Sequence, residues 1–176
     1  MKKPCEQLLL ISGPVGVGKT SVAGAVSSLL QEENVPHTFI DLDALTYTYP
    51  RIETDPFNSS LALEILTAMW ANCRKRGSKN LVIARVIEKR SDAEAIADAV
   101  NIYNPVLCRL TASASTLKER IRMRKAGSNI SWQENRSIQL STAMEKSKIE
   151  DFCISTQDRS ITDIVMEINQ FMTWSR

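Results

Sequence analysis

Residues 13–21 combine residue types and a spacing that suit the binding of a polyphosphate. They read Gly13, Pro14, Val15, Gly16, Val17, Gly18, Lys19, Thr20 and Ser21, which contains the pattern G-x-x-x-x-G-K-T. Glycines let such a loop curl with its N–H groups pointing inward, while the lysine reaches the outer phosphates and the threonine hydroxyl ligates Mg²⁺. We therefore predict that this segment binds ATP and Mg²⁺. A glycine-rich turn without a ligand would need neither Lys19 nor Thr20.

The residues on either side of this loop have the patterns of a strand and a helix. The apolar run 8–11 precedes it directly. After it, apolar residues recur at helical spacing, at Val22, Val26, Leu29 and Leu30. Such a repeat is typical of a helix that packs on a core. The strand, loop and helix order is the context that a phosphate-binding loop requires.

A second chemical signal is a pair of carboxylates, Asp41 and Asp43, at the end of the apolar run that begins at His37. In a parallel α/β sheet, the carboxyl end of this strand lies beside the phosphate-binding loop. One carboxylate could hold a Mg²⁺-bound water beside Thr20, and the other could orient a hydroxyl or accept its proton. Alternatively, both residues could simply cap a turn at the strand end.

A third signal is the basic segment 118–125. Arg120 and Arg124 are four residues apart, so a helix would place them on one face. Two guanidinium groups could close over the γ-phosphate, with Gly127, Ser128 and Asn129 as the flexible tip of a lid. The same spacing also fits a solvated basic helix face.

Two further groups of residues suggest an acceptor site. Arg85 and Glu88 lie at the end of the third apolar strand, where many proteins with such a loop have an aspartate that this chain lacks. Arg85 could meet an anionic acceptor, or the two residues could form an ion pair. Aromatic side chains that could line an acceptor pocket are Tyr47, Tyr49, Trp70 and Trp132. For Trp70, which falls on a predicted helix, core packing is the favoured interpretation.

The composition predicts a single soluble domain over residues 1–176. The chain is 43% hydrophobic and 24% charged, which suits one globular core. A net charge of +2 is too small to indicate nucleic-acid binding, and no apolar run is long enough to span a membrane, so we expect a cytoplasmic protein. The four dispersed cysteines and the single histidine support neither a disulfide framework nor a zinc site. We expect these cysteines to be buried. The sequence does not indicate the oligomeric state.

Strand and helix patterns alternate along the whole chain. Five apolar runs predict strands at 7–12, 38–42, 81–87, 106–111 and 152–155. Helices are predicted after the loop and at 59–76, from 91, at 113–125 and at 132–148, with a last helix capped by Ser160. The third of these helices has a capping-box pattern at 91–94. The alternation predicts an α/β fold in three layers, with a five-stranded parallel sheet between helices and the ligand at the carboxyl ends of its strands.

The chain resembles the small P-loop kinases, a group that includes shikimate, gluconate and adenylylsulfate kinases and chloramphenicol phosphotransferase-like proteins. The resemblance rests on residues 13–20, on Asp41-Leu42-Asp43, and on the arginine-containing segment after the fourth strand, and it spans the chain in element order and length. Segment 44–51 matches none of the named kinases closely and is more similar to an uncharacterised bacterial branch of the superfamily.

This resemblance implies specific roles for several residues. Asp41 would serve the metal and Asp43 the acceptor hydroxyl, and a mobile lid would span residues 118–135. The family likeness favours Arg120 and Arg124 over Arg122 as the lid arginines. It also places Arg159, in the segment 157–159, near the adenine, although a loop that enters a helix would have a similar composition.

We therefore predict an ATP- and Mg²⁺-dependent phosphotransferase that acts on a small hydroxyl-bearing molecule, with no nucleic-acid or membrane partner. The alternative is a nucleotide-binding module, or a slow NTPase, whose output is regulation or partner binding. The absence of an aspartate at the end of the third strand weakens the case for an efficient NTPase.

Overall fold

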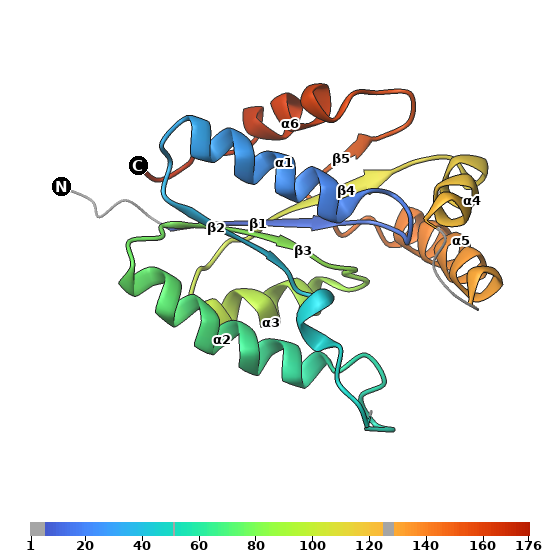
Figure 1. Ribbon diagram of the computed structural model, residues 1–176, viewed down its shortest axis with the longest axis horizontal. Coiled ribbons are helices and arrows are strands. Elements are labelled where there is room, and N and C mark those ends of the chain that lie inside the picture. Colours follow the sequence, from blue (N-terminus) through green and yellow to red (C-terminus); the bar gives the residue numbers. More distant parts are fainter. Residues whose placement is uncertain (1–5, 51, 125–128) are drawn as a thin grey trace.

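In the computed structural model, five parallel strands form one sheet in the order β2-β3-β1-β4-β5 (Figure 1). The structure describes residues 6–50, 52–124 and 129–176. The strands are β1 (Gln7–Ser12), β2 (His37–Asp41), β3 (Asn80–Ala84), β4 (Val106–Thr111) and β5 (Phe152–Ser155). The predicted α/β fold with a five-stranded parallel sheet is confirmed, and the strand that leads into the phosphate-binding loop lies at the centre of the sheet.

Helices cover both faces of the sheet. Helices α1 (Lys19–Glu32) and α6 (Ile161–Gln170) pack together on one face, and α2 (Ser59–Lys75) and α3 (Arg90–Val100) pack together on the other. Helices α4 (Ala114–Met123) and α5 (Ile130–Ser147) lie side by side near the carboxyl ends of the strands (Figure 1). A short 3₁₀ helix, η1 (Ala44–Thr46), follows β2. This arrangement gathers the loops after β1, β2 and β3 at one end of the sheet.

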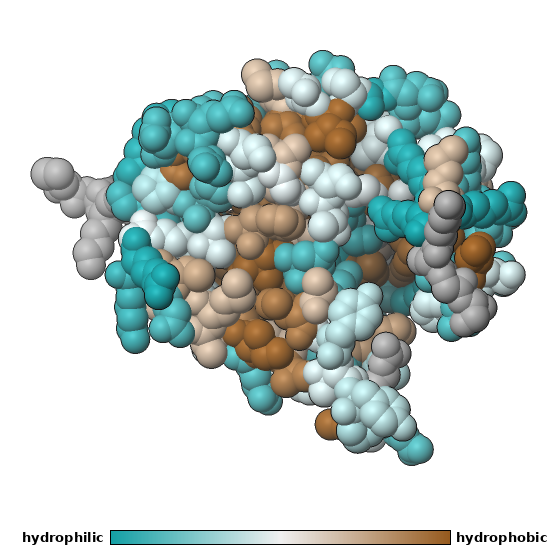
Figure 2. Space-filling model, in the orientation of Figure 1, coloured by the Kyte–Doolittle hydropathy of each residue, from teal (hydrophilic) through white to brown (hydrophobic). Residues whose placement is uncertain are grey.

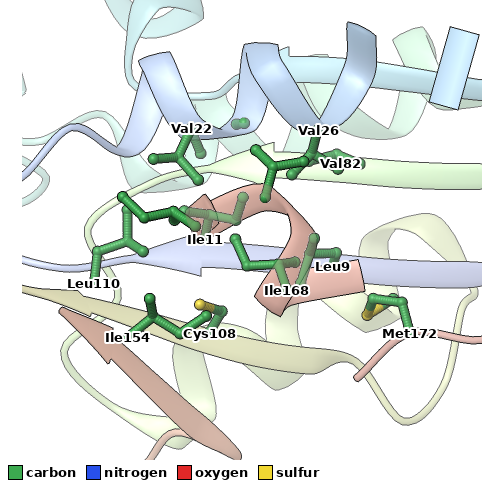
Figure 3. Close-up of a cluster of buried hydrophobic side chains, with 14 of the residues drawn as sticks. Leu9, Ile11, Val22, Val26, Val82, Cys108, Leu110, Ile154, Ile168 and Met172 are labelled. Atoms are coloured by element: carbon green, nitrogen blue, oxygen red, sulfur yellow. The ribbon is translucent and has the colours of Figure 1, made fainter. Parts of the chain in front are cut away.

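Two apolar layers hold the helices to the sheet. On the side of α1 and α6, residues Leu9 and Ile11 of β1 contact Val22 and Val26 of α1 (Figure 3). The opposite layer includes Trp70, which is 1% exposed, so the prediction that it belongs to the core is confirmed. Because the central strands are buried on both faces, they read as continuous apolar runs in the sequence.

Strand β3 is shorter than predicted. It ends at Ala84, whereas the predicted strand continues to Ile87. The chain turns over the end of β1 instead, because the Ile87 N–H donates to the Ser12 hydroxyl oxygen at 2.9 Å. The turn keeps Ile87 buried while it directs the neighbouring Arg85 and Glu88 toward the end of the sheet that carries the phosphate-binding loop.

The starts of two helices test the predicted caps. Helix α3 begins at Arg90, and the Asp92 carboxylate accepts a hydrogen bond from the Lys89 N–H at 3.1 Å, so Ser91 is not its cap. Helix α6 is capped by Ser160 as predicted. Its terminal apolar residues Ile161 and Phe171 are nevertheless about half exposed, because they lie at the two ends of the helix.

The cysteines are less buried than predicted. Cys108 in the central part of the sheet is buried, but Cys73 is half-buried and Cys153 on the edge strand β5 is exposed. Cys5 lies outside the described residues. Within the described part of the chain, no helix has the length and apolar character needed to cross a bilayer.

Candidate active site

The loop between β1 and α1 has a backbone that only glycine can adopt at key positions. Gly13, Gly16 and Gly18 all have positive φ, at 142°, 85° and 101°. A Cβ atom on Gly13 would lie 2.6 Å from the Leu110 carbonyl oxygen, and one on Gly16 would lie 3.0 Å from the Leu117 carbonyl oxygen. The glycines therefore serve both the curl of the loop and its close approach to β4 and α4.

Neighbouring elements hold two carbonyl groups of this loop from outside. The buried Ser137 hydroxyl of α5 donates to the Val15 carbonyl at 2.6 Å, and the Thr156 hydroxyl donates to the Val17 carbonyl at 3.2 Å. In a planar trans peptide the carbonyl and the following N–H point in opposite directions. These contacts therefore direct the N–H groups of Gly16 and Gly18 away from Ser137 and Thr156.

We expect Ser137→Ala to loosen the loop. The substitution leaves the Val15 carbonyl without its donor, so the free energy of unfolding should fall by about 1–3 kcal/mol. Urea denaturation measures this loss, and titration calorimetry should show weaker ATP binding. Ser147→Ala on the same helix is the control, because among the described residues the Ser147 hydroxyl hydrogen-bonds only to the Met144 carbonyl of its own helix. Equal stability of the two variants would contradict the expectation.

Lys19 folds back over the loop. Its ammonium group donates to the carbonyl oxygens of Gly13 and Pro14 at 3.1 and 3.2 Å. The pKa of Lys19 is lowered to about 8, mainly by burial and also by the nearby Arg124, whereas the charges of Asp43 and Asp41 act in the opposite direction. A polyphosphate bound here would stabilise the ammonium form, since an opposite charge favours ionisation.

This lowered pKa predicts a pH dependence of ATP binding. Above about pH 8 the unliganded protein loses the Lys19 proton, so binding must recover it. ATP affinity should therefore change little from pH 7 to 8 and then fall by up to about tenfold per pH unit. Titration calorimetry at pH 7, 8 and 9 tests this. In Lys19→Arg the guanidinium stays charged over this pH range, so its ATP affinity should show no such fall. A parallel decline of ATP affinity in both proteins would show that the pH dependence does not come from Lys19.

Thr20 and Asp41 form an oxygen pair beside the loop. The Thr20 hydroxyl donates to Asp41 Oδ2 at 2.6 Å, and Asp41 Oδ1 accepts from the Ala44 N–H at 3.2 Å. One carboxylate oxygen thus caps the turn after β2 and the other contacts Thr20 of the loop. The role of Asp41 toward Mg²⁺ stays a prediction. Hydroxyl and carboxylate oxygens suit Mg²⁺, whose remaining ligands are commonly phosphate oxygens and water. The described residues hold no cluster of three His, Cys, Asp or Glu side chains suited to a metal.

Asp43 is close to Lys19 and also lines a cleft. It precedes η1, and the cleft has a volume of about 680 Å³. Burial raises the pKa of Asp43, and the positive charges of Lys19 and Arg85 oppose this shift. A carboxylate with a raised pKa is a stronger proton acceptor than an ordinary aspartate. The two aspartates are thus divided between the phosphate-binding loop and the cleft.

The cleft draws its walls from the loop after β1, residues 43–47 and 56–59, α2, the turn after β3, α3 and α5. Its lining comprises Val15, Asp43, Thr46, Tyr47, Pro56, Phe57, Asn58, Ser59, Leu63, Arg85, Val86, Glu88, Lys89, Asp92, Ala95, Ile96, Trp132, Arg136 and Leu140. Tyr47 and Trp132 lie there as predicted, whereas Tyr49 is not part of this lining. Phe57 and Arg136 also belong to it, and the sequence analysis missed both.

The charged groups after β3 have partners that the sequence did not reveal. Glu88 forms an ion pair with Arg136 of α5, and Arg85 Nη2 donates to the Ser59 hydroxyl at 3.1 Å. The predicted alternative of an Arg85–Glu88 ion pair is therefore wrong, because the turn brings Glu88 to α5 and Arg85 to α2. The Arg136 guanidinium also lies over the Phe57 ring, 5.8 Å from its centroid.

The two arginines predicted for the lid have different surroundings. Arg120 donates to the Thr156 hydroxyl at 2.8 Å, to the Thr156 carbonyl at 2.9 Å and to the Val17 carbonyl at 3.4 Å. It therefore ties α4 to the phosphate-binding loop and to the segment after β5. Arg124 follows the last residue of α4 and is exposed, and its charge acts on Lys19.

The remaining predicted site residues lie at the edges of this region. Ser21 is exposed in the first turn of α1. Arg159 forms an ion pair with Glu167 of α6 at 2.6 Å. Of the predicted lid tip, Gly127 and Ser128 lie outside the described residues, while Asn129 directly precedes α5.

Solved structures share this architecture at low sequence identity. The chain is similar to shikimate kinase from Acinetobacter baumannii in complex with shikimate, with a TM-score of 0.62 and 18% identity over 95% of this chain and 92% of that one. It is also similar to a gluconokinase from Sinorhizobium meliloti 1021, with a TM-score of 0.60 and 19% identity over 94% of this chain and 90% of that one. The tunicamycin resistance protein of Deinococcus radiodurans has a TM-score of 0.60 and 17% identity, over 97% of this chain and 99% of that one. The chain therefore has the P-loop kinase-like fold.

No protein-family model matches the sequence, and no curated protein matches it either.

Proposed function

We propose that this protein transfers the γ-phosphoryl group of ATP, with Mg²⁺, to a hydroxyl group of a small molecule. The observation that carries the proposal is the separation of the two aspartates, with Asp41 bonded to Thr20 and Asp43 lining a cleft beside Lys19. A module that only bound nucleotide would not need a carboxylate in the lining of a cleft next to the phosphate-binding loop. The similarity of fold to kinases of small molecules supports the proposal.

The donor side is formed by the phosphate-binding loop. Its N–H groups and Lys19 hold the β- and γ-phosphates, while Thr20 and Asp41 would hold Mg²⁺. The metal would neutralise charge that develops on the phosphate oxygens. Arg124 lies close enough to affect Lys19, and we propose that it meets the γ-phosphate. Arg120 acts by fixing the loop, and the segment up to Arg159 borders the nucleotide base.

The acceptor side is formed by Asp43. Its carboxylate orients the acceptor hydroxyl and accepts its proton as the new oxygen–phosphorus bond forms, while the bond between the γ-phosphorus and the bridging oxygen breaks and ADP leaves. The raised pKa of Asp43 helps it hold that proton. Phosphoryl transfer depends mainly on positioning and charge neutralisation, and the roles proposed for Lys19, Asp41 and Asp43 would supply both.

Phosphorus NMR of the full chain with ATP, Mg²⁺ and a small-molecule extract tests this function. We expect a new phosphomonoester resonance to grow together with ADP. Growth of inorganic phosphate alone would favour the NTPase alternative and contradict the proposal. A parallel sample without protein corrects for spontaneous hydrolysis.

A further inference from the structure

The turn after β3 joins the end of β1 to Asp43. We propose that Ser12, the last residue of β1, is a positioning residue for phosphoryl transfer, because its hydroxyl fixes the residues 85–87 that hold the Asp43 carboxylate. This inference rests on the proposed function, since it concerns how the carboxylate that activates the acceptor is held. It follows from the directions of the backbone N–H groups in the turn and from the burial of Ser12.

The chain keeps the hydrogen-bond pattern of a parallel sheet beyond the end of β3. The Ala84 carbonyl accepts from the Leu42 N–H, on the side of β2, at 3.1 Å. The Arg85 N–H donates to the Ile11 carbonyl of β1, on the opposite side, at 3.2 Å. Successive residues of a central strand bond to opposite neighbours. In that pattern the next N–H group points toward β2 and the one after it points toward β1.

Side chains replace backbone acceptors where the neighbouring strands have ended. The Ile87 N–H donates to the Ser12 hydroxyl oxygen at 2.9 Å, and the same hydroxyl donates to the Ile87 carbonyl at 3.4 Å. On the side of β2, the Val86 N–H is directed at the Asp43 carboxylate. Adjacent peptide groups of one short turn thus connect Ser12 to Asp43.

Ser12 lies where it can control the path of this turn. Its position in β1 is in register with Arg109 of β4, so the sheet fixes its backbone. Ser12 is 2% exposed and Ile87 is 1% exposed, so water does not replace the hydroxyl as a partner of the Ile87 N–H. Removal of the hydroxyl therefore leaves a buried N–H group unsatisfied and favours a shift of the turn. Because Ser12 directly precedes Gly13, the turn and the phosphate-binding loop share one anchor.

The Asp43 carboxylate needs such an anchor more than Asp41 does. Asp41 belongs to β2, whereas Asp43 lies beyond the end of the strand. The chain after η1 protrudes from the body of the molecule at residues 47–50, where Tyr47 is 83% exposed and Tyr49 is 93% exposed (Figures 1 and 2). The position of the Asp43 carboxylate therefore depends in part on the turn after β3, which holds it from the inner side.

Ser12 thus acts on the acceptor side of the reaction without touching either substrate. A displacement of the reacting groups by about 1 Å can cost about 10²-fold in rate. Another buried serine, Ser137, holds the Val15 carbonyl of the phosphate-binding loop instead. We therefore expect loss of the Ser137 hydroxyl to act on nucleotide binding and loss of the Ser12 hydroxyl to act on kcat.

A double-mutant cycle with Ser12→Ala and Asp43→Asn tests whether Ser12 acts through Asp43. In the wild-type chain, Ser12→Ala should lower kcat by about tenfold or more, with the KM for ATP within about threefold. In the Asp43→Asn chain, the same substitution should lower kcat by less than about twofold, because the group that Ser12 positions has already lost its function. A merely structural role of Ser12 would give the same loss in both chains. Ser137→Ala is the control and should weaken ATP binding in both.

Backbone amide NMR of the full chain measures the same cycle without any substrate. Asp43→Asn should move the Val86 amide proton upfield, since an amide oxygen is a weaker acceptor than a carboxylate. In the Ser12→Ala chain this displacement should be less than about half as large. Ser12→Cys fills the space of the hydroxyl with a thiol, which is a weak acceptor. It should behave like Ser12→Ala, and it replaces that variant if the alanine protein does not fold.

A wild-type kcat in Ser12→Ala, or an equal loss of kcat in both chains, would overturn the inference. So would a displacement of the Val86 resonance that is the same with and without the Ser12 hydroxyl. The proposed function fails in a different way: the wild-type chain would then phosphorylate no alcohol, while the displacement at Val86 would still depend on Ser12. Transfer to an alcohol together with additive effects of the two substitutions would contradict this inference alone.

Discussion

Asp43→Asn is expected to lower kcat by about 10²–10⁴-fold, the range typical of a lost general base. The substitution keeps the size and most of the hydrogen-bonding geometry of the side chain, but the amide cannot accept the proton of the acceptor hydroxyl. ATP affinity should change far less than kcat, because Asp43 lines the cleft and acts on Lys19 only through its charge. Steady-state kinetics and titration calorimetry together separate the two effects.

Asp98→Asn serves as the control for this variant. Asp98 lies exposed on α3 and does not line the cleft, so the substitution makes the same chemical change away from the site. It should retain the wild-type rate. If Asp43→Asn were as active as Asp98→Asn, Asp43 could not be the residue that activates the acceptor.

Lys19→Ala is expected to weaken ATP binding by about 10²-fold or more, since charge-assisted hydrogen bonds contribute about 1.5–3 kcal/mol each. The loop should keep its shape, because Ser137, Thr156 and Arg120 hold its carbonyl groups independently of Lys19. Titration calorimetry measures the loss. Lys75→Ala, at the exposed end of α2, is the matched control. Unchanged ATP affinity in Lys19→Ala would remove the assignment of the phosphate-binding loop.

Features that depend on short sequence segments were predicted well. The glycine and lysine positions of the loop follow from a local pattern, because each is needed for a backbone or charge requirement within eight residues. The sheet was predicted because its strands are buried on both faces and alternate with amphipathic helices. The position of Asp41 beside Thr20 followed from the rule that ligands gather at the carboxyl ends of parallel strands.

Features that depend on distant segments could not be predicted. Glu88 and Arg136 are 48 residues apart, and only the packing of α5 against the turn after β3 makes them partners. Phe57 has no local signal that separates it from a core residue, and its role in the cleft depends on Arg136 and α5. Strand β3 ends early because of a hydrogen bond to Ser12, which is 75 residues away. Three-dimensional neighbours, rather than local propensity, set these details.

The partition of the γ-phosphate of ATP tests the central claim most directly. The full chain is incubated with γ-³²P-labelled ATP, Mg²⁺ and a panel of small alcohols, and the label is then separated into organic phosphate esters and inorganic phosphate. If the protein is a phosphotransferase, we expect the label to accumulate in an ester and Asp43→Asn to abolish this accumulation. Recovery of the label only as inorganic phosphate, with every alcohol in the panel, would contradict the account.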